Sequence, residues 1–375
     1  NPTILSLARD GVKVRDISTN EGQLAESYDN YHKVYIGDLM INPMDLISGA
    51  NCSLSEVEGV ISPAYINLAK KDNIYSKYYD YFFKYQYWIN AMFVHGKGVS
   101  FDNRWTINWE TMSNYKLPYP NYEEQKRIAD YLDKQCSRID EIIKDNNKEI
   151  ELLDEYMKSL ITSVIKGEIL TIKKNGLCKI KYGVKKVGSG KTPLGGAGVY
   201  SKSGILFLRS QNIYNDGLKL DDPTYITEEI DETMKNTRVY PNDVLLNITG
   251  GSIGRCCVYP KNIGLANVNQ HVSIIRVNEE VFIPSYMHYY WLSCLGTDSI
   301  NLYQTGGNRE GMSAEAIKKS HIPLYSINDQ EKIASFLDKS VDKINQVKEY
   351  RKQIIEKLEE YKKSLIYECV TGKRE

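Results

Sequence analysis

The sequence predicts an α+β protein built as two β-rich domains, each followed by a long helix. The phrase QKRIADYLDK begins at Gln125 and nearly recurs as QEKIASFLDK from Gln330, 205 positions later (330 − 125). A long stretch without Gly or Pro follows each copy, whereas the segments before each copy are rich in Asn, Gly, Tyr and short β-type runs. We expect domains at 1–122 and 171–327, and long helices at 123–170 and 328–375.

The match between the two copies extends in register beyond these phrases. Residues 158–161 and 363–366 both read KSLI, and GDLMIN from Gly37 resembles NDVLLN from Asn242 at the same offset. A repeat that includes a domain and its helix predicts two copies of one unit related by a pseudo-two-fold axis. Because residue 1 then corresponds to Leu206, we expect an N-terminal part of the first domain to be missing from this sequence.

Each predicted helix carries an apolar stripe with heptad spacing. The stretch 123–166 would form a rod about 65 Å long at 1.5 Å per residue. Asn146 interrupts the first stripe, and Arg351 occupies the corresponding position of the second. We expect the stripes to be buried by pairing of the helices as an antiparallel coiled coil; the alternative is that each stripe packs on its own domain. The residues expected in the spacer and partner contacts of these helices are Gln125, Ile128, Leu132, Leu160, Gln330, Ile333, Leu337 and Leu365.

Charge and cysteine usage limit the possible functions. The chain has 48 basic and 48 acidic residues, whereas a nucleic-acid binder is usually basic; however, the lysine-rich run 173–191 contains no acid. Seven scattered cysteines without CxxC spacing favour a reducing cytoplasm and argue against disulfides or a zinc knuckle. No apolar run is long enough to span a membrane.

Motifs that would indicate an enzyme are incomplete. GSGKT at 188–192 resembles the end of a phosphate-binding loop, but Lys185 stands where GxxxxGK[ST] requires glycine. We therefore interpret it as a Gly-rich loop that carries Lys191 toward a phosphate backbone. NPMD from Asn42 has only two residues of the Asn-Pro-Pro-aromatic tetrad of adenine methyltransferases. The sequence predicts no catalytic set and no metal site, and so a binding or scaffolding role.

The domains do offer side chains suited to base edges and phosphates. Asn and Gln can pair with adenine and Arg with guanine through two hydrogen bonds each, and Gly lets the backbone approach a duplex. The aromatic block 78–88 could stack on bases, but its spacing favours a packed helix. The DNA-binding candidates are Arg9, Asn42, Lys97, Arg104, Lys191, Arg209, Gln211, Asn212, Asn247, Asn269, Gln270, Asn308 and Arg309.

The order of domains and helices, the twin Q-x-x-I-A-x-aromatic-L-D-K phrases, the closing KSLI, and the loops GKTP and NREGMS resemble the specificity subunit of type I restriction-modification enzymes. The resemblance implies two target recognition domains, each reading half of a bipartite double-stranded DNA site, and paired helices that set the spacing. It also implies docking of two methyltransferase subunits, which use S-adenosylmethionine. This chain would bind no cofactor and catalyse nothing itself. A motor-nuclease subunit using ATP and Mg²⁺ joins some such complexes, and the sequence leaves open whether it does here.

Two other functions are compatible with parts of the sequence. The first is a coiled-coil interaction scaffold with two β-rich domains and no DNA role. The second, a self-sufficient modification enzyme, is disfavoured because cofactor and catalytic motifs are missing.

Overall fold

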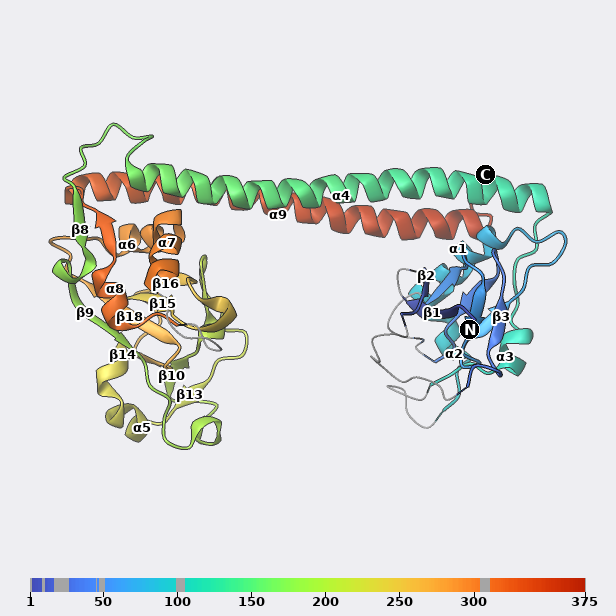
Figure 1. Ribbon diagram of the computed structural model, residues 1–375, viewed down its shortest axis with the longest axis horizontal. Coiled ribbons are helices and arrows are strands. Elements are labelled where there is room, and N and C mark those ends of the chain that lie inside the picture. The colour runs from blue at the N-terminus through green and yellow to red at the C-terminus, as the bar shows by residue number, and fades with distance from the viewer. Residues whose placement is uncertain are drawn as a thin grey trace. The chain divides into compact units, whose positions relative to one another are not determined.

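The computed structural model describes residues 2–8, 11–16, 27–44, 46, 51–98, 105–303 and 311–374. The chain divides into two compact units. Unit 1 comprises Asn1–Asn147 and Arg351–Glu375, and unit 2 comprises Lys148–Tyr350. Each unit holds one β-rich domain and a part of both long helices, α4 (Tyr122–Lys166) and α9 (Ile327–Val370) (Figure 1). The predicted helical segments 123–170 and 328–375 start within one residue of α4 and α9. Both helices end earlier than predicted, at Lys166 and Val370, because Gly167 and Gly372 take a positive φ just after them.

Unit 1 combines short strands with three helices that precede α4. Among its described residues, one sheet has the order β2-β1-β6-β3, with β1 and β6 parallel, and a second has the antiparallel order β5-β4-β7. The elements are β1 (Ile4–Ala8), β2 (Gly11–Val14), β3 (His32–Val34), β4 (Leu39–Ile41), β5 (Cys52–Leu54), β6 (Gly59–Ile61), β7 (Ile66–Leu68), α1 (Ser76–Trp88), α2 (Ala91–Val94) and α3 (Trp109–Ser113).

The aromatic block of unit 1 forms helix α1, as its spacing predicts. Tyr78, Phe82, Phe83 and Tyr87 are buried, and they pack with strands β4 and β5 and with both long helices. Aromatic side chains remove a large apolar area from water, so α1 supplies much of the core of this domain. A role in base stacking is therefore excluded for these four side chains.

Unit 2 contains more strands, and they fall into two larger sheets. The order is β13-β10-β17-β14 in one and β16-β15-β18-β9 in the other, while β11-β12 and β19-β8 form two-stranded ribbons. The strands are β8 (Leu177–Lys179), β9 (Val184–Ser189), β10 (Ile205–Leu208), β11 (Ile213–Tyr214), β12 (Gly217–Leu218), β13 (Tyr225–Ile226), β14 (Arg238–Val239), β15 (Val244–Asn247), β16 (Cys256–Val258), β17 (Ala266–Val268), β18 (Val272–Val277) and β19 (His321–Pro323). The helices are α5 (Glu228–Thr233), α6 (Pro284–Leu292), α7 (Cys294–Tyr303) and α8 (Ala314–Lys319).

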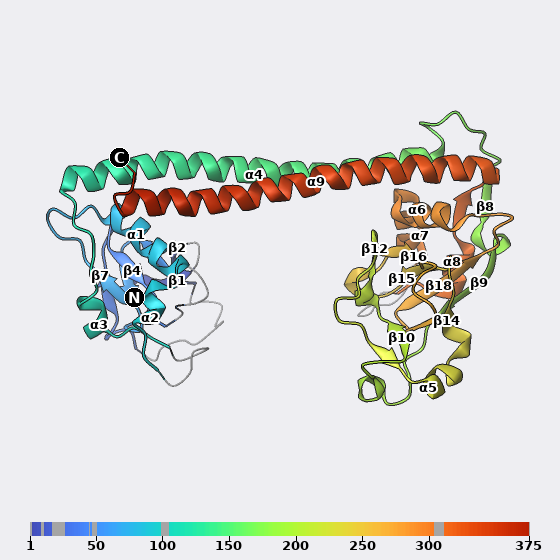
Figure 2. The ribbon, with the colours of Figure 1, turned by 180° about the vertical axis from the view of Figure 1, so that it is seen from behind.

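Helices α6 and α7 of unit 2 lie between the sheet β16-β15-β18-β9 and the long helices (Figures 1 and 2). Trp291 and Tyr290 of α6 are buried in one cluster with Val244 of β15 and Ile333 and Leu337 of α9. The apolar stripe of α9 thus meets both its own domain and the other long helix, whose Ile161, Val164 and Ile165 belong to the same cluster.

The stripe of α4 is buried in the same double manner in unit 1. Ile128, Leu132 and Ile139 pack with the aromatic residues of α1 and with Leu365 and Ile366 of α9. In each unit, side chains of the domain and of both long helices therefore belong to one core cluster. No helix in the described segments is long and apolar enough to cross a membrane.

Polar contacts within each unit show that the two helices run in opposite directions. In unit 1, Lys362 Nζ lies 2.6 Å from Asp140 Oδ1, and Arg351 donates to Asn146 Oδ1 at 3.2 Å. In unit 2, Lys348 pairs with Asp154. Further along α4 in unit 2, Ile161 and Val164 share a cluster with Leu337 of α9. In each unit, higher residue numbers on α4 therefore meet lower numbers on α9, and the two helix segments are antiparallel.

His288 of α6 gives a pH-dependent prediction for the stability of unit 2. Its Nδ1 is buried without a partner among the described residues, and burial lowers the pKa of His288 to about 4. The histidine of the unfolded chain has a pKa near 6.5, so as pH falls it binds a proton before the buried ring of the folded protein does. Proton binding therefore favours the unfolded state. We expect this residue alone to remove up to about 3 kcal/mol of stability between about pH 6.5 and pH 4.

Denaturant unfolding of the wild type and of His288→Gln at pH 7 and pH 4.5 measures this effect, since the variant lacks the ionisable ring. The wild type should lose more stability than the variant on acidification. An equal loss in both proteins would contradict the prediction.

Candidate nucleic-acid interface

The polar loops singled out in the second domain come together at the ends of its strands. Backbone hydrogen bonds join them: Lys191 N–H donates to Val268 C=O at 3.0 Å, and Asn269 N–H donates to Leu208 C=O at 3.0 Å. Gly190 packs so closely on this turn that a Cβ atom there would lie 2.0 Å from the Val268 oxygen. The loop GSGKT is therefore held by its backbone against the loops after β10 and β17.

The loop after β15 joins the same cluster through side chains. Thr249 Oγ1 lies 2.7 Å from His271 Nδ1, and Gln270 Nε2 lies 3.3 Å from His271 Nε2. Ile248 N–H also donates to His271 C=O at 3.0 Å. One amide, one imidazole and one hydroxyl, which are groups that hydrogen-bond base edges, thus stand in a connected row on unit 2.

Three asparagines among the candidates are buried and serve the loops themselves. Asn212 Oδ1 accepts from Arg209 N–H at 2.9 Å, and Asn247 Nδ2 donates to Ser210 C=O at 2.8 Å. Asn269 Oδ1 accepts from His271 N–H at 3.1 Å. Asn247 is 0% exposed. Asn247 has no exposed surface and cannot touch a base in this conformation, and the hydrogen bonds of all three asparagines hold the loops.

The remaining candidates of unit 2 are accessible. Lys191, Gln211 and Gln270 are exposed. Arg209 is half-buried, and its guanidinium lies 5.8 Å from the ring centre of Tyr200. Asn308 and Arg309 lie outside the described residues.

The described candidates of unit 1 are fewer. Asn42 is half-buried, and its Oδ1 accepts from Met44 N–H at 3.0 Å, which is a turn-forming contact. Lys97 is exposed and pairs with Thr106 in an isolated bridge. Arg9 and Arg104 lie outside the described residues.

Two other arginines of unit 2 are committed to structural ion pairs. Arg276 binds both carboxylate oxygens of Asp243 at 2.7 Å, and Arg238 bonds Asp231 at 2.6 Å and Glu232 at 2.7 Å. Both aspartates are buried, so these pairs cannot release their arginines without leaving a buried charge.

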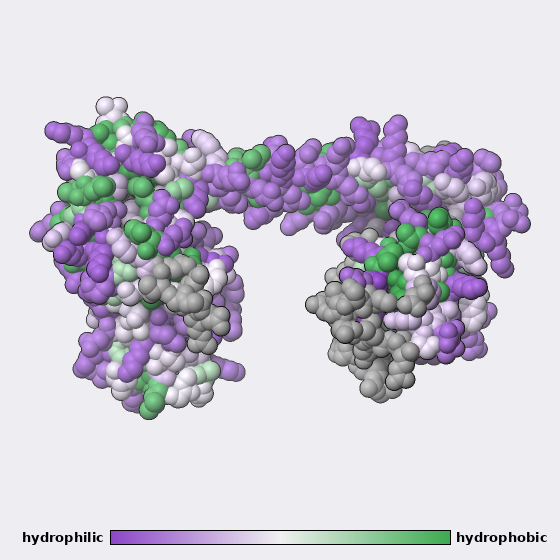
Figure 3. All heavy atoms as spheres, viewed as in Figure 1, coloured by the Kyte–Doolittle hydropathy of each residue, from purple (hydrophilic) through white to green (hydrophobic). Residues whose placement is uncertain are grey.

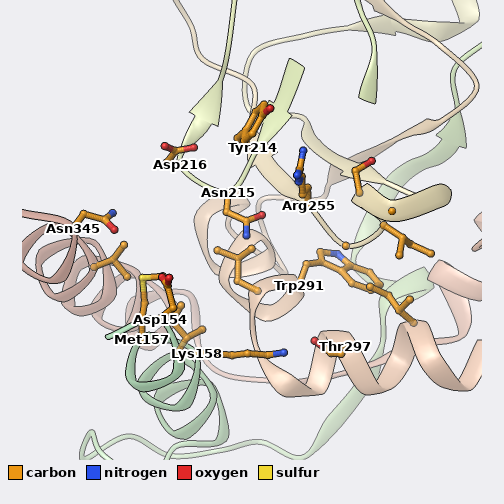
Figure 4. Close-up of a pocket in the computed structure, with 18 of the residues that line it drawn as sticks. Asp154, Met157, Lys158, Tyr214, Asn215, Asp216, Arg255, Trp291, Thr297 and Asn345 are labelled. Atoms are coloured by element: carbon orange, nitrogen blue, oxygen red, sulfur yellow. The ribbon is translucent and has the colours of Figure 1, made fainter. Parts of the chain in front are cut away.

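A cleft of about 680 Å³ in unit 2 was not foreseen from the sequence (Figure 4). Two cations lie near the Tyr214 ring at the rim of the cleft: Lys219 Nζ is 4.0 Å and the Arg255 guanidinium 4.7 Å from the ring centre. Both distances are those of cation–π contacts. Trp291 lines the cleft, and its Nε1 is buried without a partner among the described residues. These side chains and Asn345 of α9 are distant in the sequence and come together only in the fold. The cleft could therefore not be predicted from the spacing of residues.

Chemistry at cysteine or metal is not indicated by the described residues. Burial raises the pKa of the Cys256 thiol well above 9, and it also raises the pKa of Cys257 to about 12. Such thiols stay protonated and are poor nucleophiles. Within the described ranges, no group of three or more His, Cys, Asp or Glu side chains could hold a metal ion.

The fold and these loops define the class as a recognition protein, in which β-rich domains are carried on long paired helices. A profile described as the type I restriction modification DNA specificity domain matches residues 55–152 and 166–360. This chain therefore belongs to that family, and the resemblance read from the sequence is confirmed. Specificity subunits are non-catalytic components of type I systems. Membership in this family therefore does not favour either alternative function, the self-sufficient enzyme or the scaffold without a DNA role.

Individual relatives agree with the family. The chain is 23% identical over 362 residues to the Type I restriction enzyme EcoBI specificity subunit of Escherichia coli, covering 87% of this chain and 70% of the relative. It is 27% identical over 289 residues to the putative type I restriction enzyme MjaX specificity subunit of Methanocaldococcus jannaschii, covering 72% of this chain and 62% of the relative.

Two solved structures share the fold. One comes from work on complex assembly and conformational transition of the type I R-M system, with a TM-score of 0.73, 13% identity, and coverage of 92% of this chain and 84% of that chain. The other is the HsdS subunit from Thermoanaerobacter tengcongensis, with a TM-score of 0.53, 14% identity and the same coverage.

Proposed function

We propose that this chain is the DNA-reading subunit of a type I restriction-modification complex and that each β-rich domain reads one half of a bipartite site. The observation that carries this proposal is the convergence of polar loops in unit 2, in a chain of the DNA specificity family. Residues 1–122 and 171–327 would be the two target recognition domains.

Exposure divides the candidate residues of unit 2 into two roles. Lys191 and Arg209 would contact phosphates, and Gln211 and Gln270 would reach base edges. The buried Asn212, Asn247 and Asn269 would position these loops. In the first domain, Asn42, Lys97, Arg9 and Arg104 remain the proposed contacts, as do Asn308 and Arg309 in the second.

The long helices would act as the spacer between half-sites. Antiparallel pairing as a coiled coil and an internal repeat are part of this proposal. They are supported by the contact of Asn146 with Arg351, because these residues stand 205 positions apart and correspond in the repeat. In a pseudo-two-fold pair of antiparallel helices, corresponding residues meet only at the axis.

We also propose the partners. Two methyltransferase subunits using S-adenosylmethionine would dock on the helices, and the complex would act in the cytoplasm. Where motor-nuclease subunits also join, they would add ATP- and Mg²⁺-dependent cleavage. Figure 3 shows mainly hydrophilic residues on the exposed side of the helices. Within unit 2, however, Leu152, Tyr156, Val347 and Tyr350 are exposed, and apolar side chains of this size are suited to a protein contact.

Mapping of methylated adenines tests the proposed function. Cells that express the chain with its modification subunits should methylate one bipartite motif that disappears when the chain is deleted. A chain carrying Gln211→Ala and Gln270→Ala should relax one half of that motif and leave the other half unchanged, because both residues lie in unit 2. An unchanged methylation map after deletion would refute the proposal.

A further inference from the structure

The repeated glutamine of the long helices makes an unusual set of hydrogen bonds in unit 2. Gln330 is 0% exposed. Its Oε1 accepts from Ile283 N–H at 3.0 Å, and its Nε2 donates to Val281 C=O at 2.8 Å and to Tyr325 C=O at 3.0 Å. Ile283 is the N-cap residue of α6, and Tyr325 lies just before α9. One side chain therefore ties the start of a domain helix to the start of the long helix.

Gln125 makes the same set of bonds in unit 1, and it is also 0% exposed. Its Oε1 accepts from Tyr75 N–H at 2.8 Å, and its Nε2 donates to Asn73 C=O at 3.3 Å and to Pro120 C=O at 2.8 Å. Tyr75 is the N-cap residue of α1, as Ile283 is of α6. The three bonded groups thus occupy equivalent places in both units.

The chemistry of these contacts requires glutamine. A neutral primary amide offers one acceptor oxygen and two N–H donors, and each glutamine uses all three in its three hydrogen bonds. An ionised glutamate would place a carboxylate oxygen, which cannot donate, against the two carbonyl oxygens. Methionine would leave one N–H and two C=O groups without this partner. Each buried polar group left without a partner destabilises the folded state.

A second equivalent contact lies two turns further along each long helix. Tyr81 of α1 donates to Asp133 Oδ1 at 2.8 Å, and Tyr289 of α6 donates to Asp338 Oδ1 at 2.6 Å. Burial, together with the aspartate, raises the pKa of both tyrosines, so both phenols remain donors. A domain helix held at two separated points cannot pivot on the long helix.

We propose that Gln125 and Gln330 are positioning residues that fix the angle of each reading domain on the helix pair and thereby restrict the spacer length that the complex accepts. This inference rests on the proposed reading of a bipartite site. A domain free to pivot would reach half-sites displaced by a base pair, so loss of the contact relaxes the spacing without altering which bases are read.

The test uses the full chain assembled with its methyltransferase subunits, and DNA duplexes whose half-sites are kept while the spacer changes by single base pairs. Gln125→Met and Gln330→Met keep the side-chain volume and remove the hydrogen bonds. Lys126→Met and Glu331→Met, at the adjacent exposed positions, are matched controls. We expect the preference for the best spacer over its neighbours to fall about tenfold in the Gln variants and to persist in the controls, since tenfold corresponds to about 1.4 kcal/mol.

Hydrogen exchange provides a readout without DNA. The Ile283 amide should exchange faster in Gln330→Met, and the Tyr75 amide faster in Gln125→Met, with each change confined to one unit. If a methionine variant does not fold, Gln330→Glu takes its place: its carboxyl faces two carbonyl groups, so it regains a donor and the spacer preference as pH falls.

Equal weakening at every spacer length would overturn the proposal, because it would assign these glutamines to general stability alone. An unchanged spacer preference in both Gln variants would overturn it as well. A wild-type complex that shows no preference for any bipartite site would instead refute the proposed function, so the two failures are distinguishable.

Discussion

Insertion of one heptad into each long helix, after Asn147 in α4 and after Tyr350 in α9, is expected to lengthen the spacer of the recognised site by about three base pairs. Seven helical residues add about 10 Å, and one base pair of B-DNA rises about 3.4 Å. The insertions fall at the boundaries between the two units. They leave Asn146 opposite Arg351 and Asp154 opposite Lys348, so the helix contacts within each unit are kept.

The methylated motif of cells carrying the lengthened chain measures this effect. Both half-sites should keep their sequence while the spacer grows. A heptad in α4 alone is the control, because it shifts one helix past the other and should abolish modification. If the doubly lengthened chain methylates the original spacer, the helices do not set the distance.

The starts of the long helices could be predicted to within a residue because their signals are local. Uninterrupted helix formers, heptad apolar spacing and a closing glycine act within a few turns of chain. The short β-type runs of the domains have equally local signals, and β10, β15 and β18 lie in three such runs, GILFLRS, DVLLNIT and HVSIIRV. The pairing of these strands, and the double burial of each helix stripe, depend on contacts distant in sequence and could not be read from periodicity.

The role of Gln125 and Gln330 illustrates a different limit. The sequence marked both residues because they recur, but recurrence does not say what a side chain touches. Their partners, such as Ile283 and Tyr75, contribute only backbone groups, which no residue type encodes. Only the fold reveals that the repeated residue joins the domain to the helix.

The same limit applies to the candidate interface. Residue type pointed to loops that the fold brings together through contacts of Lys191 and His271, and their binding to DNA stays a prediction. Residue type does not distinguish an asparagine that holds a turn from one that faces solvent, and Asn247 is fully buried. The flanked ring of Tyr214 was missed because its cations, Lys219 and Arg255, come from different loops.

Replacement of Leu337 by Ala is expected to destabilise unit 2 by about 2–5 kcal/mol, and replacement of Leu132 by Ala should do the same to unit 1. Both leucines are 0% exposed, and each lies in a cluster formed by its own domain and both long helices. A cavity at such a three-way contact cannot collapse without moving a domain relative to its helices, so the cost should lie in the upper part of the range.

Hydrogen exchange in increasing denaturant measures both variants unit by unit. Leu337→Ala should lower the protection of β15, β18 and α6, and Leu132→Ala that of β4 and α1, because the units have separate cores. Leu160→Ala is the control: this leucine is only partly buried at the edge of the unit 2 cluster, so fewer contacts are lost. Equal losses of protection in both units from either substitution would show that the long helices couple the two cores into one cooperative structure.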